Sequence, residues 1–160
     1  MATLYANEAD KVLNTTPIDK ADTNAAHGRV RILSDEITLA AELSAGDVIK
    51  FGGVKMPKGA RLVGARLVSP QLGSGGGNGE LDMGWEAGAN GDEAADADGI
   101  FDGVEVGSAV ADVDLQDSSA ASGAYLKVFD EAVQIIITAN ETTDAGSGDT
   151  IQAHLYYVLD

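Results

Sequence analysis

Short stretches of alternating apolar and polar residues follow one another along most of the chain. The clearest is ELDMGWE at 80–86, where Leu81, Met83 and Trp85 point to one side and the residues between them point to water. A period of two residues is typical of a β-strand that buries one face. Further strands are expected at residues 30–33, 37–43, 48–51, 60–69, 104–106, 113–115, 133–139 and 150–159.

Turn signals separate these stretches and support an all-β fold. Pro57 and Gly59 indicate a turn after residue 56, Pro70 ends the apolar run at 60–69, and the glycine-rich run 73–79 indicates a hairpin loop. About eight strands without a strong helix or a repeat predict an antiparallel β-sandwich, and a jelly roll is a plausible topology beside other sandwich arrangements. The stretch 37–43 leaves an alternative open, because Ser34 could also cap a helix there.

One of the expected strands, VQIIITA at 133–139, is unusually apolar. We expect Val133, Ile135 and Ile137 to point inward. If this strand lies at a sheet edge, its backbone groups must be paired or covered, and a neighbouring molecule would do so where the chain itself does not. The run therefore favours an oligomer.

Residues 1–28 differ from the rest, because they show no sustained period of two or of 3.6 residues. Their apolar residues are spaced as single anchors: Leu4, Tyr5, Val12, Leu13 and Ile18. Two interpretations stay open, a frayed terminus and an arm that becomes ordered on a partner. We divide the chain into an extended N-terminal arm, 1–28, and a β-sandwich domain, 29–160.

Composition and charge narrow the classes of function. The 160 residues suffice for one domain, the absence of cysteine excludes thiol chemistry and disulfides, and the net charge of −16 disfavours nucleic acid and anionic membranes as partners. Residues 1–66 carry nine of the ten basic residues and eight acids, whereas 67–160 carry Lys127 and eighteen acids. We expect the first part to dock and the second to face water. No signal peptide or apolar membrane span is recognisable, so we expect a protein made in the cytoplasm.

Candidate catalytic residues are few. The two histidines, His27 and His154, lie in no nucleophile motif, and no metal-binding pattern includes them. The glycine-rich run precedes Glu80 and Asp82 on a strand, which opposes phosphate binding. Because Trp85 alternates with polar residues, it is expected in the core and not on an exposed carbohydrate platform. We expect no enzymatic activity and no cofactor.

The acidic stretch 92–105 has some character of a calcium loop. With Gly99 at the sixth position, Asp96, Asp98 and Glu105 fall at ligand positions three, five and twelve. Alanine occupies the first ligand position, and no helix is expected to follow. A solvated acidic turn is therefore the favoured interpretation, and a metal site at these three residues is a weak alternative.

Several segments together resemble the capsid decoration, or cement, proteins of tailed bacteriophages. They are MATLYANEADK at 1–11, HGRVRI at 27–32, AGDVIKFGGVKMPKGARLVGARLV at 45–68, LDMGWEA at 81–87, EAADADGIFD at 93–102, YLKVFDEAVQIIITA at 125–139 and IQAHLYYVLD at 151–160. The resemblance implies a non-enzymatic virion protein on the outer capsid surface, often a trimer at threefold positions. Such a protein binds the major capsid protein and bridges neighbouring capsomers.

This resemblance gives the arm a role. We expect residues 1–28 to lie on the capsid or on an adjacent subunit, with Arg29 and Arg31 pairing with capsid acids at the junction. Two alternatives stay open. One is an adhesion or carbohydrate-binding module with a calcium-bearing acidic loop, and the other is a tail or fibre component of the same virion.

Overall fold

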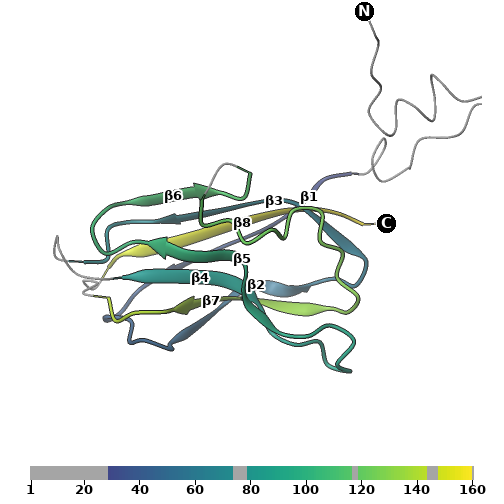
Figure 1. Cartoon of the computed structure of the whole chain (residues 1–160), viewed down its shortest axis with the longest axis horizontal. Helices are drawn as coiled ribbons and strands as arrows, with labels where there is room; N and C mark the ends of the chain where they lie inside the picture. The colour runs from purple at the N-terminus through teal and green to yellow at the C-terminus, as the bar shows by residue number, and fades with distance from the viewer. Residues whose placement is uncertain (1–28, 74–78, 117–118, 144–147, 160) are drawn as a thin grey trace, which may run out of the picture.

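The computed structural model describes residues 29–73, 79–116, 119–143 and 148–159 (Figure 1). The predicted arm, 1–28, lies outside the described residues. Within them, all regular secondary structure is β-strand, in two four-stranded sheets packed face to face. The strands are β1 (Arg31–Thr38), β2 (Val48–Met56), β3 (Ala60–Ser69), β4 (Glu80–Trp85), β5 (Asp96–Glu105), β6 (Ala111–Asp114), β7 (Val133–Ala139) and β8 (Thr150–Leu159). No helix in this part of the chain is long and apolar enough to cross a membrane.

The topology confirms the predicted antiparallel β-sandwich and is that of a jelly roll. One sheet has the order β1-β8-β3-β6 and the other β2-β7-β4-β5, and every pairing is antiparallel. Consecutive strands alternate between the sheets except at the β4–β5 hairpin, which is the pattern of two joined Greek keys. The two inner faces enclose a single apolar core.

A bulge explains why β3 is apolar on both faces. Its register with β8 shifts between Leu62 and Gly64. A one-residue shift reverses which residues face inward, so Ala60 and Leu62 are buried before the bulge and Ala65 and Leu67 after it. The strand has both predicted boundaries, and it is central in its sheet as expected.

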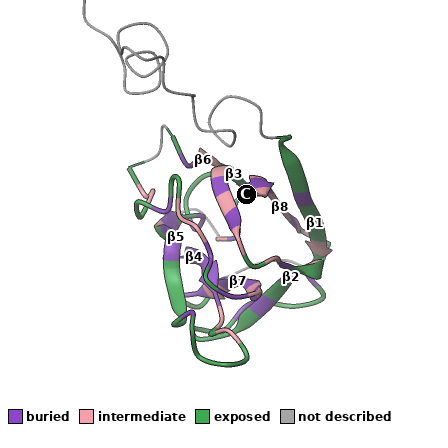
Figure 2. Ribbon diagram, turned by 90° about the vertical axis from the view of Figure 1, so that its right-hand side faces the viewer, coloured by how far each residue is buried: buried purple, intermediate pink, exposed green. Residues whose placement is uncertain are grey.

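The core contains most of the residues that the alternation placed inside. Val133, Ile135 and Ile137 are fully buried, and Trp85 is 4% exposed. Trp85 packs edge to face against Phe129, with ring centroids 5.2 Å apart. Figure 2 shows the resulting contrast between the largely buried central strands and the exposed β1 at one side. The core interpretation of Trp85 is confirmed.

The start of the domain differs from the prediction. The two expected pieces, 30–33 and 37–43, are one strand that ends at Thr38, and neither a strand nor a capped helix covers 39–47. Here the chain crosses from one sheet to the other, so it cannot stay in either ladder. Leu39 and Leu43 are buried as anchors of this crossing, whereas Ala41 is exposed.

The strand at 133–139 is not an edge. β7 pairs with β2 on one side and β4 on the other, so its own chain satisfies both of its hydrogen-bonding edges. The argument for an oligomer from this strand is therefore wrong. The outer strands among the described residues are β1 and β6 in one sheet and β2 and β5 in the other.

The second face of β4 is not wet as predicted. Asp82 is 6% exposed, and its carboxylate accepts a hydrogen bond from the Gly103 backbone N–H at 2.8 Å. At Gly84 a Cβ would collide with the backbone of Asp96 and Ala97, so β5 passes directly over this position. Register shifts between β4 and β5 bring the strands this close.

Candidate functional site

The first surface of interest is the start of β1, directly after the predicted arm. Val30 is 62% exposed and Ile32 is 55% exposed. The predicted contact residues Arg29 and Arg31 flank them and are also exposed. Among the described residues, no carboxylate forms an ion pair with either arginine. We call these four residues, Arg29 to Ile32, the β1 surface.

In the described part of the chain, the backbone at the β1 surface is paired on one side only. β1 pairs only with β8, with Ile32 opposite Tyr156. Further along, β2 approaches, since Leu33 packs on Gly52 and the Gly52 N–H donates to Asp35 Oδ2 at 3.0 Å. The uncovered part of the edge is therefore its beginning.

His154 lies on the outer face of the β1-β8-β3-β6 sheet. Its Nδ1 is 2.8 Å from the Oγ of Ser34, a hydroxyl paired with a base. Within the described ranges no carboxylate hydrogen-bonds to this histidine, and the pair lies on an exposed sheet face. A third orienting group, which a catalytic triad needs, is not brought to the pair. The other histidine, His27, lies outside the described residues.

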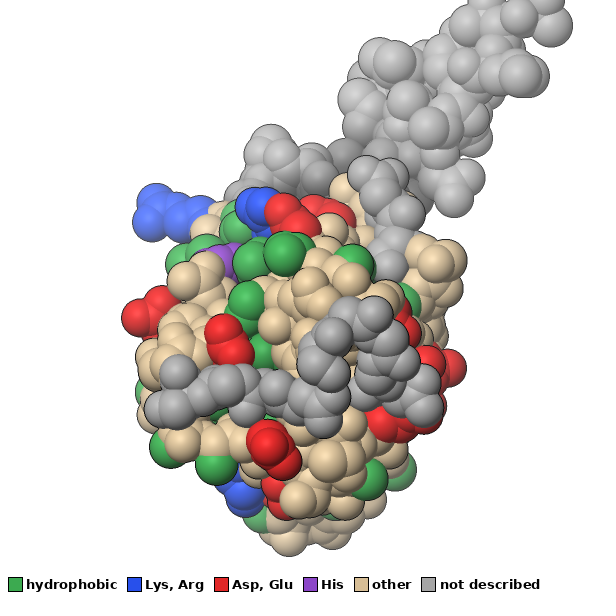
Figure 3. Space-filling model, turned by 90° about the vertical axis from the view of Figure 1, so that its left-hand side faces the viewer, with side chains coloured by type: hydrophobic (Ala, Val, Ile, Leu, Met, Phe, Trp, Pro, Cys, Tyr) green, Lys and Arg blue, Asp and Glu red, His purple; other side chains and the backbone are tan. Residues whose placement is uncertain are grey.

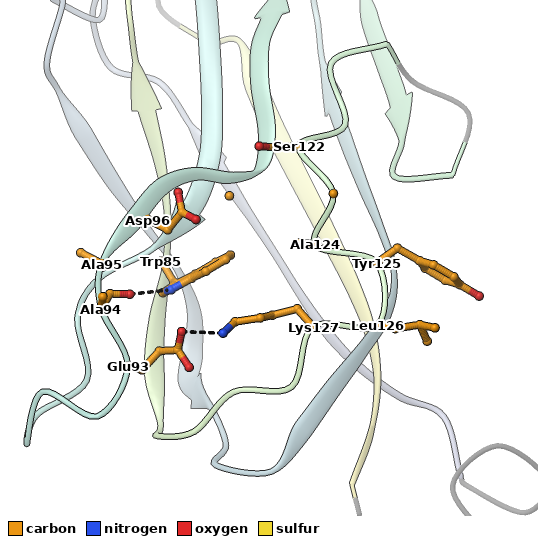
Figure 4. Close-up of a pocket in the computed structure, with 12 residues that line it drawn as sticks. Trp85, Glu93, Ala94, Ala95, Asp96, Ser122, Ala124, Tyr125, Leu126 and Lys127 are labelled. Carbon is orange, nitrogen blue, oxygen red and sulfur yellow. Dashed lines mark hydrogen bonds and ion pairs between the residues drawn. The ribbon is translucent and has the colours of Figure 1, made fainter. Parts of the chain in front are cut away.

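A pocket of about 480 Å³ lies at the opposite side of the sandwich, over Trp85. The segment 93–96 forms one wall and the segment 122–127 the other (Figure 4). The Trp85 indole N–H donates to the Ala94 carbonyl at 2.9 Å. Tyr125 and Leu126 lie on the far wall with their side chains pointing away from Trp85, and they are 50% and 46% exposed.

An ion pair joins the two walls of this pocket. Lys127 Nζ is 2.7 Å from Glu93 Oε1, and the Glu93 side chain is only 6% exposed. Glu93 also accepts from the Asp130 N–H at 2.9 Å. The Lys127 ammonium lies 5.7 Å from the Trp85 ring centroid and 5.8 Å from that of Phe129, within reach of a cation–π contact. Each charged group of the ion pair therefore has its partners within the domain, so the pair stabilises the fold.

Two further buried carboxylates also serve the fold. Glu131 accepts from the Asn90 N–H at 2.7 Å and from the Asp92 N–H at 3.2 Å, which fixes the loop before β5. Burial opposes ionisation of Glu131, but the backbone hydrogen bonds outweigh it and lower its pKa. At Asp82, burial dominates over the Gly103 hydrogen bond and raises the pKa.

The three weak metal candidates do not meet. Asp96 and Asp98 begin β5, and Glu105 ends it. At about 3.3 Å per residue, the strand places Glu105 roughly 20 Å from Asp98. Glu105 instead accepts hydrogen bonds from Gly107 and Ser108 in the next turn. Across the described segments, no group of three metal-ligating side chains comes together. The loop prediction is wrong because these residues continue the β4–β5 hairpin.

Asp96 and Asp98 lie close to each other. Partial burial, followed by the hydrogen bond and charge of Asp98, raises the pKa of Asp96. Both side chains are exposed, and neither forms an ion pair within the described part of the chain. We call the exposed residues Asp96 and Asp98 the β5 surface.

Apart from Asp82, Glu93 and Glu131, the described acidic residues of the second part of the chain are exposed or half-buried. Figure 3 shows Asp and Glu side chains around one end of the sandwich, with few Lys or Arg between them. Of the basic residues, Lys50 pairs with Glu86 and Arg66 with Asp112. Among the described residues, Arg29 and Arg31 form no ion pair with a carboxylate.

The structure describes only some of the residues that the sequence predicts as a contact site. The anchors Leu4, Tyr5, Val12, Leu13 and Ile18 lie outside the described residues, and their role stays a prediction. Arg29 and Arg31 are exposed, as a contact site requires. The Lys127–Glu93 pair was missed. The only sequence signal for it was that Lys127 is the single base after residue 66.

Comparison with known proteins gives likenesses only among solved structures. No protein-family model and no curated protein matches the chain. A chain in the capsid of Ralstonia phage GP4 has a TM-score of 0.65 at 25% identity, covering 83% of this chain and 86% of that chain. A chain in the cyanophage Pam1 capsid asymmetric unit has a TM-score of 0.60 at 16% identity, with the same coverage, and shows the shared fold. The likeness to the chain of the GP4 capsid supports a virion structural protein related to phage capsids.

Proposed function

We propose that this chain is a non-enzymatic virion protein that binds the outer surface of a phage capsid and bridges neighbouring capsomers. The observation that carries this proposal is the likeness to a chain of the Ralstonia phage GP4 capsid, which extends over most of both chains. The partner is the major capsid protein. The protein acts as a trimer and is made in the cytoplasm of the host.

The arm and the β1 surface together form the contact with the capsid or with an adjacent subunit. Residues 1–28 lie on the capsid or on an adjacent subunit, where the apolar anchors of the arm are buried. Arg29 and Arg31 pair with acidic groups at the junction. The exposed apolar residues Val30 and Ile32 support this role, as does the absence of an ion pair between either arginine and a described carboxylate.

Such a contact does not need a strong local site. A capsid displays many equivalent positions, and a trimer that contacts several of them gains affinity from each additional contact. Aromatic and aliphatic anchors in a buried patch contribute most of the binding energy at protein interfaces. The strongly acidic remainder faces solvent and disfavours nonspecific association with nucleic acid.

The carbohydrate-binding alternative is not favoured. It needs exposed aromatic platforms and a calcium site, whereas Trp85 is 4% exposed and Asp96, Asp98 and Glu105 do not converge. The alternative of a tail or fibre component differs from the proposal in location and in copy number.

Deletion of residues 2–25 tests the proposal. Capsids that lack this protein are mixed with the purified full chain or with the deleted form and pelleted. We expect the full chain to pellet with the capsids and the deleted form to stay in the supernatant, still folded by circular dichroism. Normal binding of the deleted form would reject the role of the arm. Failure of the full chain to bind would reject the function.

A matched control separates the arm from charge. The pair Lys55→Ala and Lys58→Ala removes two exposed basic side chains near the β2–β3 turn and leaves the β1 surface intact. This variant should bind capsids as the unmodified chain does. If it lost binding to the same extent as the deletion, nonspecific charge would explain the association.

A further inference from the structure

The β1 and β5 surfaces are complementary in character. The β1 surface combines two arginines with two exposed aliphatic side chains. The β5 surface carries two exposed aspartates, Asp96 and Asp98. In each surface the charged groups have no ion-pair partner among the described residues.

One copy cannot bring these surfaces together. β1 borders the sandwich beside β2, and β5 borders it beside β6. Figure 2 shows β1 and β5 on opposite sides of the molecule. Contact between them therefore requires a second copy.

Both strands end a sheet among the described residues: β1 pairs with β8 alone and β5 with β4 alone. β5 is covered further along, where the Asp102 N–H donates to the Ala120 carbonyl at 2.8 Å and the Ser122 N–H to the Ile100 carbonyl at 3.0 Å. The exposed residues 96–98 precede this covered part. An open edge with apolar side chains is a site of strand association unless something covers it.

Charge decides between two ways of pairing the copies. If β1 of one copy paired with β1 of another, Arg29 and Arg31 of both copies would gather at one interface, and such like-charge contact is unfavourable. Pairing β1 with β5 instead brings arginines to aspartates. Cations would also relieve the mutual repulsion that contributes to the raised pKa of Asp96.

We propose that the β1 surface of one copy binds the β5 surface of the next, so that Arg29 and Arg31 pair with Asp96 and Asp98 of a second copy. Because the two surfaces differ, the interface is heterologous, and a heterologous interface that closes gives a ring. This inference rests on the proposed trimer and names the contact that closes it.

Charge reversal tests the inference on the full chain in solution, without capsids. The variants are R29E/R31E, D96K/D98K and the combination of all four substitutions. Oligomeric mass is measured by light scattering and sedimentation over a range of concentrations. We expect each double variant to weaken self-association by about tenfold or more, and the combined variant to return to within about threefold of the unmodified chain.

Two controls keep the result interpretable. K55E/K58E changes the charge by the same amount as R29E/R31E but at the β2–β3 turn, and it should leave the mass unchanged. Circular dichroism should show all variants folded, because every substituted side chain is exposed. Recovery in the combined variant would not follow from a folding defect.

The outcomes separate this inference from the proposed capsid binding. A chain that stays monomeric at all concentrations but pellets with capsids would overturn the inference and the trimer, and would leave the binding of the capsid standing. Self-association that ignores the β1 and β5 charges, or that the combined variant does not restore, would also overturn it. Charge-dependent association without capsid binding would support the inference and reject the function.

Discussion

The strands β1 and β5 both end a sheet, on opposite sides of the sandwich, but their surroundings differ. Beside β5, the segment 120–122 pairs with the strand, and the Lys127–Glu93 pair closes the pocket over Trp85. At the beginning of β1, the arginines and aliphatic side chains are exposed, and the strand pairs with β8 alone among the described residues. The comparison indicates that the segments beside β5 hold the domain together, whereas the start of β1 contributes little to the core.

The largest expected difference between the two sides is in core packing. Trp85→Ala removes a buried ring that packs on Phe129 and should lower the free energy of unfolding by about 3–5 kcal/mol. Ile32→Ala, at the β1 surface, should change it by less than about 0.5 kcal/mol. Urea unfolding followed by circular dichroism measures both. A loss at Ile32 as large as that at Trp85 would show that the β1 edge is part of the core structure.

Replacing a basic residue should give a smaller difference in unfolding free energy between the β5 side and the β1 surface. Lys127→Met leaves the buried Glu93 carboxylate without its ion-pair partner. It should lower the free energy of unfolding by about 2 kcal/mol, because a buried charge without a partner destabilises the folded state. Arg31→Met should cost less than about 0.5 kcal/mol, since an exposed and unpaired side chain contributes little. Adding Glu93→Gln to Lys127→Met should recover part of the loss in the same unfolding measurement. If the double variant were no more stable than Lys127→Met, the buried charge would not be the cause.

The pH dependence of the melting temperature tests the role of Glu131 on the β5 side. The pKa of Glu131 is lowered by folding, so its ionised form contributes stability above about pH 4.5, and this contribution is lost as the pH falls through the folded-state pKa. Glu131→Gln should therefore lower the melting temperature at pH 7 and flatten the acid limb. Equal losses at pH 7 and pH 3 would contradict this assignment.

Asp82 should show the opposite sign and a smaller effect. Its pKa is raised by burial, so the charged form costs stability at neutral pH, and the cost fades as the pH falls towards 3.8. Asp82→Asn keeps an acceptor for the Gly103 N–H and should raise the melting temperature at pH 7. The gain should disappear at pH 3. A destabilised Asp82→Asn protein at pH 7 would show that the carboxylate is needed for its hydrogen bond.

The sequence predicts those strands whose bounds are set by neighbouring residues in the chain. The boundaries of β3, β7 and β8 were predicted, because alternation or an apolar run bounded by turn residues defines each of them. The stretch 37–43 alternates as well, but β1 ends at Thr38 because the chain must cross between sheets there. Nothing local in the sequence marks this crossing.

Pairing between distant strands was beyond the sequence. The sequence alone allows β7 to be an edge, although β2 and β4 enclose it, and it favours a loop for the acidic stretch, although most of that stretch is β5. The same limit applies to the candidate site. Arg29 and Arg31 were found from their place beside the arm, whereas the Lys127–Glu93 pair joins residues that only the jelly roll brings together.

The most direct test of the central claim is the amount and position of this chain in purified virions. Quantitative mass spectrometry gives its copy number relative to the major shell protein, and surface labelling of intact particles shows whether it lies outside. The account predicts a copy number near that of the shell protein, with labelling before the particle is opened. Absence from the virion, a copy number typical of a tail part, or protection inside the particle would contradict it.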